Sequence, residues 1–442
     1  MKNRILALAV PNIISNLTVP LLGMVDLALL GRLESEKYLG AIALGTLIFN
    51  FIYWGFGFLR MGTTGFAAQQ YGEKNHKGIQ SILLQSLFLA AAVSLLVLVC
   101  QRPIEWFAFE LLEGSAETEA LAAEYFRIRI FAAPATLMLY VFSGWFLGLQ
   151  NARYPLWLSL VTNILNIGFS FLFIQVFKMH VDGAAWGSLL AQYGGLFMAL
   201  YFLKRKYAAY LKKIVWKDIF RVAQLKRLLL VNRDILLRTI CLLLVINFFT
   251  AKSAAQGDMT LAVNTLLMQF SILFSYLMDG FAFAGEALIG KSYGARNQKE
   301  HRRLIRSLFA WGFFLAVVFS AVYALVPEQI LRVLTTNQSV IDNARPYVPW
   351  LAALPLLSFA SYLWDGIFIG MTASRQMLIS MLLAAFIIFF PVYYGFTASL
   401  SNHGLWMAFV LFLLGRGLFQ TVLYVFQLDK AISSKYNFIY LN

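Results

Sequence analysis

The sequence predicts an all-α, polytopic membrane protein with twelve transmembrane helices in two six-helix lobes that are related by an internal repeat. Three observations lead to this prediction: an apolar composition, apolar stretches of membrane-spanning length, and motifs that occur once in each half of the chain. Of the 442 residues, 60% are hydrophobic and only 13% are charged. A soluble globular protein carries roughly twice that charged fraction. The composition therefore excludes a soluble globule.

Apolar stretches of about 20 residues, the length that crosses a bilayer core as a helix, occur six times in each half. The first stretch is too long for a signal peptide and lacks a cleavage site of small residues, so we expect it to remain as the first helix. The predicted spans are 5–30, 38–60, 80–100, 125–148, 156–177, 184–203, 229–250, 260–284, 305–326, 347–371, 377–398 and 404–427.

Two motifs return at a fixed offset. The segment 60–75 ends in Tyr-Gly-x-x-Asn, and 282–297 ends in the same pattern 222 positions later. The segment 148–153, Gly-Leu-Gln-Asn-Ala-Arg, returns at 370–375 as Gly-Met-Thr-Ala-Ser-Arg with the same offset. Internal repeats in a membrane chain are typical of transporters, whose substrate and ion sites lie between two bundles or within one of them.

The repeat and the lengths of the loops predict four regions. These are an N-terminal lobe at 1–203, a basic inter-lobe linker at 204–228, a C-terminal lobe at 229–428 and a tail at 429–442. The linker alternates lysines with aliphatic and aromatic residues, which suits an interfacial helix on anionic headgroups. A solvated linker is the alternative.

Charge distribution predicts the orientation in the membrane. Lysines and arginines gather in alternate loops and in the linker, whereas the loop 102–124 carries six glutamates. Because basic loops stay on the cytoplasmic side, we expect both termini and the tail in the cytoplasm and 102–124 outside. Topology thus accounts for the net charge of +15. A basic groove interleaved with aromatic residues is missing, so we expect no nucleic-acid partner.

Asp26 is the first candidate functional residue. It has apolar neighbours for a full helical turn on both sides and no basic residue nearby in the sequence. An unpaired carboxylate at the centre of a membrane helix costs roughly 2.5–3.5 kcal/mol, and this cost falls when the group binds a proton or a cation. Pro11 and Pro20 precede it, and each removes a backbone donor, so we expect a bend in this helix. A structural acid at a helix end is the alternative.

The string from Leu8 to Asp26, together with the segments 58–65 and 278–287, resembles the DinF-like branch of the multidrug and toxic compound extrusion (MATE) transporters. The resemblance covers nearly the whole chain. It implies a secondary transporter of a bacterial inner membrane that exports amphiphilic or cationic compounds by antiport against H⁺ or Na⁺. It also implies that Asp26 is the site of the proton or cation and that Pro11 is the helix-1 proline of the family.

One departure from the family pattern lies in the fifth span. Many proton-coupled relatives carry Asn-x-x-x-Asp there, whereas this chain has Asn166 followed by Ser170. We therefore expect a neutral partner for Asp26, hydrogen bonds from Asn166 and Asn163, and exchange of a single proton. For the two asparagines, polar contacts between helices are the alternative.

Three acids of the second half are further candidates: Asp279, Glu286 and Asp365. They could bind a cationic substrate. The alternative is a structural polar network with Arg416 or Arg238, because buried acids in membranes pair with basic residues.

The sequence gives little support for nucleotide binding, metal binding or catalysis. The segment 285–292 matches the literal P-loop pattern, but it ends a long apolar stretch and lacks the preceding strand, so we regard the match as chance. The four histidines and two cysteines are dispersed without metal-ligand spacing. We expect no cofactor, no metal and no enzymatic activity. A membrane-embedded enzyme is the least favoured reading.

A lipid-linked oligosaccharide flippase is the main alternative to an exporter. Such a protein needs several basic residues in its cavity to hold pyrophosphate. Here the spans offer only Arg416 and, at their ends, Arg60 and Arg238. The expected partners are accordingly a small-molecule substrate, H⁺ or Na⁺, and the lipid bilayer, with the protein acting as a monomer.

Overall fold

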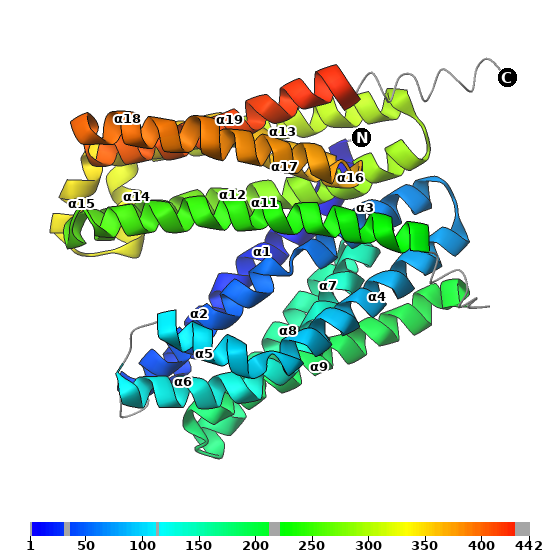
Figure 1. The fold of residues 1–442 in the computed structure, drawn as a ribbon, viewed down its shortest axis with the longest axis horizontal. Coiled ribbons are helices and arrows are strands. Elements are labelled where there is room, and N and C mark those ends of the chain that lie inside the picture. Colours follow the sequence, from blue (N-terminus) through cyan, green and yellow to red (C-terminus); the bar gives the residue numbers. More distant parts are fainter. Residues whose placement is uncertain (1, 31–35, 112–114, 212–221, 429–442) are drawn as a thin grey trace. The chain divides into compact units, whose positions relative to one another are not determined.

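The computed structural model describes residues 2–30, 36–111, 115–211 and 222–428. Within 19–30, and at positions 2, 36, 111, 427 and 428, it describes the backbone but not the side chains. The described residues form helices and short connections without any β-strand, which confirms the all-α prediction (Figure 1). The helices of the first half are α1 (Lys2–Leu30), α2 (Glu36–Gly55), α3 (Phe58–Gly72), α4 (His76–Val99), α5 (Gln101–Leu111), α6 (Ala116–Arg129), η1 (Ile130–Ala132), α7 (Ala133–Gly148), α8 (Arg153–Phe171), η2 (Leu172–Val176), α9 (His180–Tyr207) and η3 (Ala208–Leu211).

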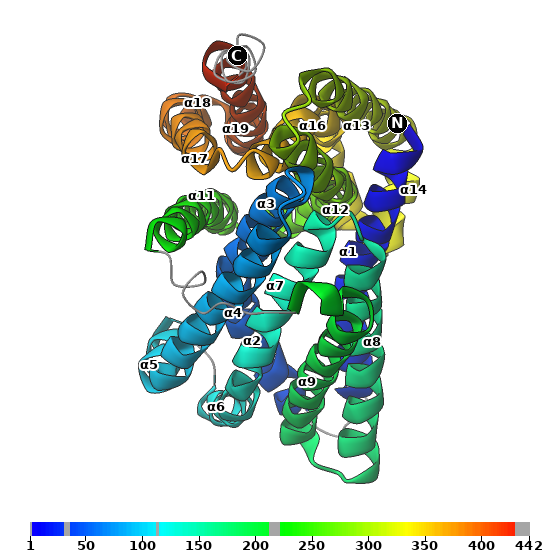
Figure 2. The same cartoon turned by 90° about the vertical axis from the view of Figure 1, so that its right-hand side faces the viewer.

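The second half repeats this succession of helices. Its helices are α11 (Val222–Ala254), α12 (Asp258–Gly294), α13 (Gln298–Leu325), α14 (Pro327–Leu334), α15 (Gln338–Ala344), η4 (Arg345–Tyr347), α16 (Val348–Gly370), α17 (Ser374–Leu383), η5 (Ala384–Phe389), α18 (Phe390–Leu400), α19 (Asn402–Leu423) and η6 (Tyr424–Leu428). Helices α8 and α9 pack along each other, as do α12 and α16 (Figure 2).

Nine helical segments of the described chain are long and apolar enough to cross a membrane. The predicted spans 5–30, 184–203 and 229–250 lie on α1, α9 and α11, which are not among the nine. Part of α1 lies outside the residues whose side chains the structure describes, and α9 contains four glycines and Gln192, which lower its mean hydropathy. The segments that meet the criterion are Lys37–Gly72, His76–Val99, Ala116–Gly148, Arg153–Val176, Asp258–Gly294, Gln298–Leu325, Gln338–Gly370, Ser374–Leu400 and Asn402–Phe426.

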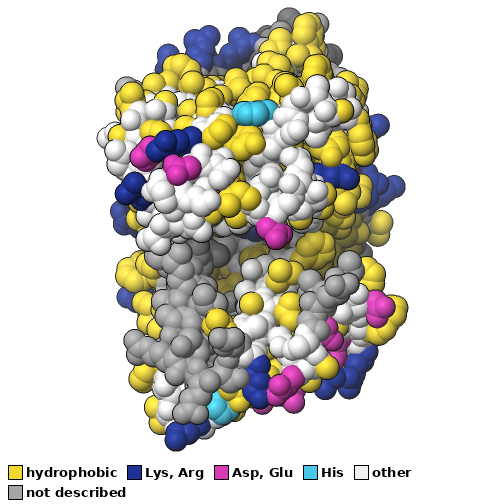
Figure 3. Space-filling model, turned by 90° about the vertical axis from the view of Figure 1, so that its left-hand side faces the viewer, with side chains coloured by type: hydrophobic (Ala, Val, Ile, Leu, Met, Phe, Trp, Pro, Cys, Tyr) yellow, Lys and Arg dark blue, Asp and Glu magenta, His cyan; other side chains and the backbone are white. Residues whose placement is uncertain are grey.

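Large apolar side chains cover much of the surface. Leu325 is 80% exposed and Phe197 is 68% exposed, whereas Trp145 and Trp406 are fully buried. On the face drawn in Figure 3, hydrophobic side chains reach the surface widely and acidic side chains are few. Contiguous apolar surface of this extent is stable only in contact with lipid. The surface therefore supports a membrane-embedded protein.

The internal repeat is visible in the ends of the helices. The segment from α2 to α3 runs from Glu36 to Gly72, and α12 runs from Asp258 to Gly294, which is 222 positions later at both ends. After each segment an asparagine caps the next helix: the side chain of Asn75 accepts from the backbone N–H of Gly78, and Asn297 accepts from that of Glu300. The repeated sequence motifs thus specify the same turn twice.

The repeat also fixes two matching helix crossings. A Cβ atom on Gly144 would lie 2.3 Å from the carbonyl oxygen of Arg60, and one on Gly366 would lie 2.2 Å from that of Ala282. Both pairs are again 222 positions apart. Because only glycine permits such close backbone contact, α7 on α3 and α16 on α12 share one packing geometry. This confirms the predicted internal repeat.

The chain divides into two compact units. One contains Met1–Ile13 and Leu230–Asn442, and the other contains Ile14–Leu229. The first residues of α1 belong to the unit that holds the second half, and α11 begins in the unit that holds the first half. The lobe boundaries at 203 and 229 remain a prediction.

Both described flanks of the predicted linker pack within the unit Ile14–Leu229. On the N-terminal side, the hydroxyl of Tyr207 accepts a hydrogen bond from Nδ2 of Asn151 at 3.2 Å, and its ring lies 5.1 Å from that of Trp145. On the C-terminal side, the guanidinium of Arg227 lies 5.2 Å from the ring of Phe66. Residues 212–221 lie outside the described part of the chain, as does the whole of the predicted tail.

Candidate functional site

Asp26 and Pro20 lie on α1, in the part of the helix whose side chains are outside the described structure. Their predicted roles therefore stay predictions. Pro11 lies earlier on the same helix, next to a close crossing. A Cβ atom on Gly280 would lie 2.3 Å from Cγ1 of Ile13 and 3.0 Å from the carbonyl oxygen of Ala9. The first half of α1 thus packs directly against the backbone of α12.

A line of buried polar side chains runs along α8. Thr162, Asn166 and Ser170 are spaced four residues apart, which places them on one face of the helix. They face glycines of α9, because a Cβ atom on Gly187 would lie 2.8 Å from Oγ of Ser170, and one on Gly195 would lie 2.2 Å from Oγ1 of Thr162. Asn166 and Ser170 were predicted from the sequence, whereas Thr162 was not, although it falls in the same four-residue spacing.

This line is only partly hydrogen-bonded. Nδ2 of Asn166 donates to Oγ of Ser188 at 2.9 Å. Oδ1 of Asn166, Oγ of Ser170 and Nδ2 of Asn163 have no hydrogen-bond partner among the described residues. Leaving a buried polar group unsatisfied costs about 1–3 kcal/mol, so such groups in a native protein point to a function or a ligand. The α8 line is therefore able to accept hydrogen bonds or to coordinate a cation.

The second half contains a buried charged cluster centred on Asp365 of α16. Nη2 of Arg416 donates to Oδ2 of Asp365 at 2.7 Å, and Nε2 of Gln420 donates to Oδ1 at 2.6 Å. Arg238 of α11 donates to Oδ2 as well. Arg416 and Gln420 are four residues apart on α19, so they lie on one face of the helix and donate to the two carboxylate oxygens of Asp365. Asp365 is thus engaged by three donors, two of them cationic.

Two further acids lie on α12. Glu286 is buried, and Asp279 lies seven residues, or about two helical turns, before it. The hydrogen bonds to Asp365 come from α11 and α19 rather than from these acids. The structure therefore brings Asp365 together with Arg416 and Arg238 and leaves the roles of Asp279 and Glu286 as predictions.

A second polar contact in this half escaped the sequence analysis. Asp234 of α11 accepts hydrogen bonds from Ser374 and Arg233. One comes from Oγ of Ser374 at 3.1 Å, and another comes from Nη2 of Arg233 at 2.8 Å. The sequence signal that could have revealed this contact is the presence of charged residues inside an apolar stretch. Among the described residues, no group of His, Cys, Asp and Glu side chains could hold a metal ion.

Comparisons with known proteins agree with the arrangement of the helices. The MatE family model matches residues 11–172 and again residues 236–394. The chain is 39% identical to DNA damage-inducible protein F of Escherichia coli (strain K12) over 93% of this chain and 89% of that protein. It is 25% identical to a probable multidrug resistance protein NorM of Thermotoga maritima over 78% of this chain and 75% of that protein.

The fold is similar to that of solved structures. A crystal structure of MATE in the bent conformation superimposes with a TM-score of 0.90, covering 99% of this chain and 97% of that chain at 19% identity. At this identity the likeness concerns the fold, which is that of a protein with twelve transmembrane helices. With the double match of the family model, it follows that the chain belongs to the MatE family and is a multi-pass membrane transporter rather than an enzyme.

Proposed function

We propose that this protein exports amphiphilic, cationic toxic compounds by antiport against protons, with Na⁺ as the alternative coupling ion. Membership of the MatE family and similarity to a NorM protein support drug export. One observation carries the choice of coupling residue. Asp26 is an acid with no basic residue within one helical turn of it in the sequence, whereas Asp365 already has three hydrogen-bond donors. Asp26 is therefore the carboxylate that gains most from binding a proton or cation.

Helix α8 supplies the other groups of the proposed coupling site. Oδ1 of Asn166 and Oγ of Ser170 lack partners among the described residues, so each can accept a hydrogen bond from a protonated carboxyl group. Asn163 lies one turn away from Asn166 on the same helix. Since Ser170 replaces the second acid of related proteins, one proton per cycle is the simplest stoichiometry. Coupling requires that Asp26 hold its proton more tightly in one conformation than in the other.

The proposal includes the setting of the protein. It acts as a monomer in a bacterial inner membrane, with both termini in the cytoplasm and lobes at 1–203 and 229–428. Pro11 and Pro20 allow α1 to bend as the site changes its protonation state. Asp279 and Glu286 contribute to the polar interior that a cationic substrate meets.

The arginines disfavour an oligosaccharide flippase. Arg416 and Arg238 both donate to Asp365, so their charge is already partly neutralised before any pyrophosphate could bind. The cluster lacks the excess positive charge that a dianionic headgroup requires.

Transport by purified protein in liposomes tests the proposal. We expect an imposed proton gradient to drive the movement of cationic dyes, and a sodium gradient without a pH difference to drive it only if Na⁺ is the coupling ion. Movement of lipid-linked sugars, together with no dye transport under either gradient, would contradict an exporter.

A further inference from the structure

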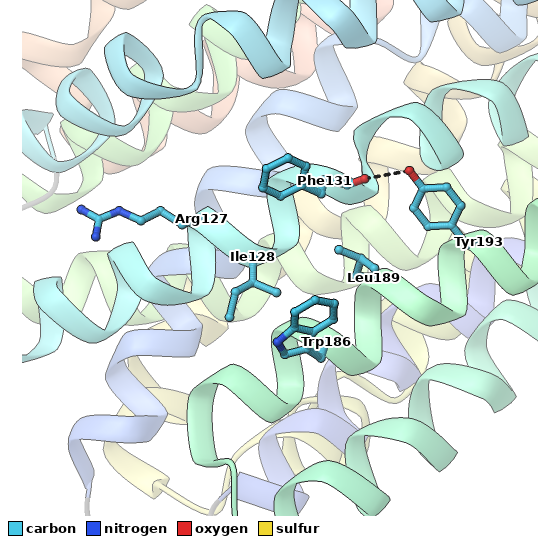
Figure 4. A pocket seen from close by; sticks show the side chains of 6 residues that line it. All are labelled: Arg127, Ile128, Phe131, Trp186, Leu189 and Tyr193. Carbon is cyan, nitrogen blue, oxygen red and sulfur yellow. Dashed lines mark hydrogen bonds between the residues drawn. The ribbon is translucent and has the colours of Figure 1, made fainter.

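A cavity of about 350 Å³ lies within the unit Ile14–Leu229, between the α6–η1 segment and α9. This volume is at the lower end of the range of about 300–1,000 Å³ that ligand sites occupy. Its walls are apolar and aromatic except for one arginine, which lies at one end of the group in Figure 4. The lining residues are Arg127, Ile128, Phe131, Trp186, Leu189 and Tyr193.

The cavity is open at the surface of this unit. Phe131 and Trp186 are 50% and 41% exposed. The apolar surface continues along α9 through Leu190 and Phe197, which are also exposed. The hydroxyl of Tyr193 donates to the carbonyl oxygen of Phe131 at 3.1 Å, which leaves both rings as walls. An apolar slot that continues into an exposed apolar helix face suits a hydrocarbon chain better than a dissolved solute.

The arginine lies at the depth of the headgroups. The segment Ala116–Gly148 has 33 residues, more than the ~20 that cross the hydrocarbon core. From Arg127 to Gly148 the helix rises roughly 30 Å at 1.5 Å per residue, which is the thickness of that core. Arg127 therefore lies at the interface opposite Gly148, and this is the outer interface in the orientation proposed above.

The guanidinium of Arg127 has capacity for another acceptor. Its Nε and Nη2 donate to a single oxygen of Glu105, at 2.9 and 2.7 Å. Nη1 makes no hydrogen bond or ion pair with another described residue, and the side chain is half exposed. Arginine binds phosphate oxygens with charge-assisted hydrogen bonds.

Two carboxylates lie one helical turn farther out. Glu124 precedes Arg127 by three residues on α6, and Asp182 precedes Trp186 by four residues on α9, before the predicted span begins. Burial raises the pKa of Asp182, and the nearby charge of Glu124 adds to this effect. Oδ1 of Asp182 is buried without a hydrogen-bond partner among the described residues. Two like charges in this position favour a cation beside them.

We propose that this cavity binds one phospholipid with a primary amine in its headgroup, phosphatidylethanolamine. The order of groups along the two helices is carboxylates, arginine and then apolar slot, and this matches ammonium, phosphate and acyl chain. A primary ammonium has three N–H donors for Glu124 and Asp182. A trimethylated choline headgroup has the same charge but no N–H to donate. This site is separate from the proposed coupling residues, and its failure would leave their role untouched.

The experiment uses the full-length protein in lipid nanodiscs and phosphatidylethanolamine with a photoactivatable group in the acyl chain. We expect covalent adducts within 127–131 and 186–193. Labelling should be at least about tenfold lower for the matching phosphatidylcholine, because one hydrogen bond to a charged group contributes about 1.5–3 kcal/mol. Leu189→Trp, which fills the slot, should remove the labelling, whereas Ile164→Trp, at an exposed apolar position of α8 that does not line the cavity, should not.

The headgroup contacts are tested separately. Glu124→Gln combined with Asp182→Asn should abolish the preference for phosphatidylethanolamine while acyl-chain labelling at 186–193 persists. Arg127 is left unchanged because its removal would take both guanidinium hydrogen bonds from the buried Glu105 carboxylate and leave only Arg102, at 3.7 Å, beside it among the described residues. The proposal would be overturned if lipids with ethanolamine, choline and glycerol headgroups labelled the protein equally and Leu189→Trp did not reduce the labelling. Such a result would mean that the cavity makes only non-specific contact with bulk lipid. Binding of ²²Na⁺ that depends on Asp182, without lipid preference, would overturn it as well.

Discussion

Asp365 in the second half accepts hydrogen bonds from two arginines and a glutamine. The equivalent position in the first half, 222 residues earlier, is occupied by Ser143. The arginines themselves correspond to neutral residues, Gly194 for Arg416 and Asn16 for Arg238. Conversely, Asp26 of the first half corresponds to a phenylalanine of the second. The two halves therefore share their turns and crossings but differ in their interior charges.

This difference separates scaffold from chemistry. The shared features are backbone contacts, such as the crossings at Gly144 and Gly366, and they determine how helices pack. The differing features are charged residues within apolar stretches of the sequence. A buried charged side chain that is paired holds its helices together. A carboxylate that has no basic residue close to it in the sequence can instead bind and release a proton. We infer that the first half carries the coupling ion and that the second half holds its helices by an internal ion cluster.

The largest expected effect tests this division at Asp26. Asp26→Asn should reduce gradient-driven dye export by at least about tenfold, because the amide cannot gain and lose a proton. Its melting temperature in detergent should equal that of the unchanged protein. Undiminished export in proteoliposomes would remove the role that we assign to Asp26.

The converse is expected at Asp365. Asp365→Asn removes the buried carboxylate to which Arg238 and Arg416 both donate, and breaking such a cluster costs about 3–5 kcal/mol of folding free energy. Thermal unfolding measures this loss. The matched control is Asp342→Asn, which removes a half-exposed acid 3.5 Å from Arg345 and should cost about 0–1 kcal/mol. Similar losses for both variants would show that the cluster contributes nothing special.

The two glycine crossings test the shared scaffold. Gly144→Ala and Gly366→Ala each place a methyl group within 2.3 Å of a backbone carbonyl oxygen. Each should therefore destabilise the protein by about 1–3 kcal/mol, and by similar amounts. Gly168→Ala is the control, since a methyl group there meets nothing within 4 Å. A large effect at only one crossing would mean that the halves pack differently.

The smallest effect concerns a helix break found in the first half alone. Helix α2 ends at Gly55 and α3 begins at Phe58, whereas α12 runs uninterrupted through the equivalent positions. Glycine lowers helix stability by about 1 kcal/mol relative to alanine. Gly55→Ala, which has open space around it, should raise stability by up to about 1 kcal/mol and slow dye export. Unchanged export would indicate that this break is not used during transport.

The repeated parts of the fold were the parts best predicted from the sequence. The motif around Tyr71 and Asn75 and its copy 222 positions later were recognised as a repeat, and in the structure each coincides with a helix end and an asparagine cap. It did not locate the break after Gly55, since isolated glycines also occur in continuous membrane helices. It treated 102–124 as a loop, although α5 and the start of α6 occupy most of that segment.

The sites divide in a similar way. Residues such as Asp365 stand out because charge is rare in an apolar stretch, and their candidate arginine partners could be named for the same reason. Ser188 and Ser374 could not be found, because serine is common in membrane helices and each acts through a neighbour 22 or 140 positions away. Only packing decides which serine meets which partner.

The packing of the linker flanks has a consequence for how the polypeptide can be cut. Tyr207 and Arg227, on either side of residues 212–221, rest on the same compact unit. A protease that cleaves between them would sever the backbone while both new ends stay anchored by neighbouring rings. Two fragments produced in one cell, divided at that segment, should accordingly reassemble into a working carrier.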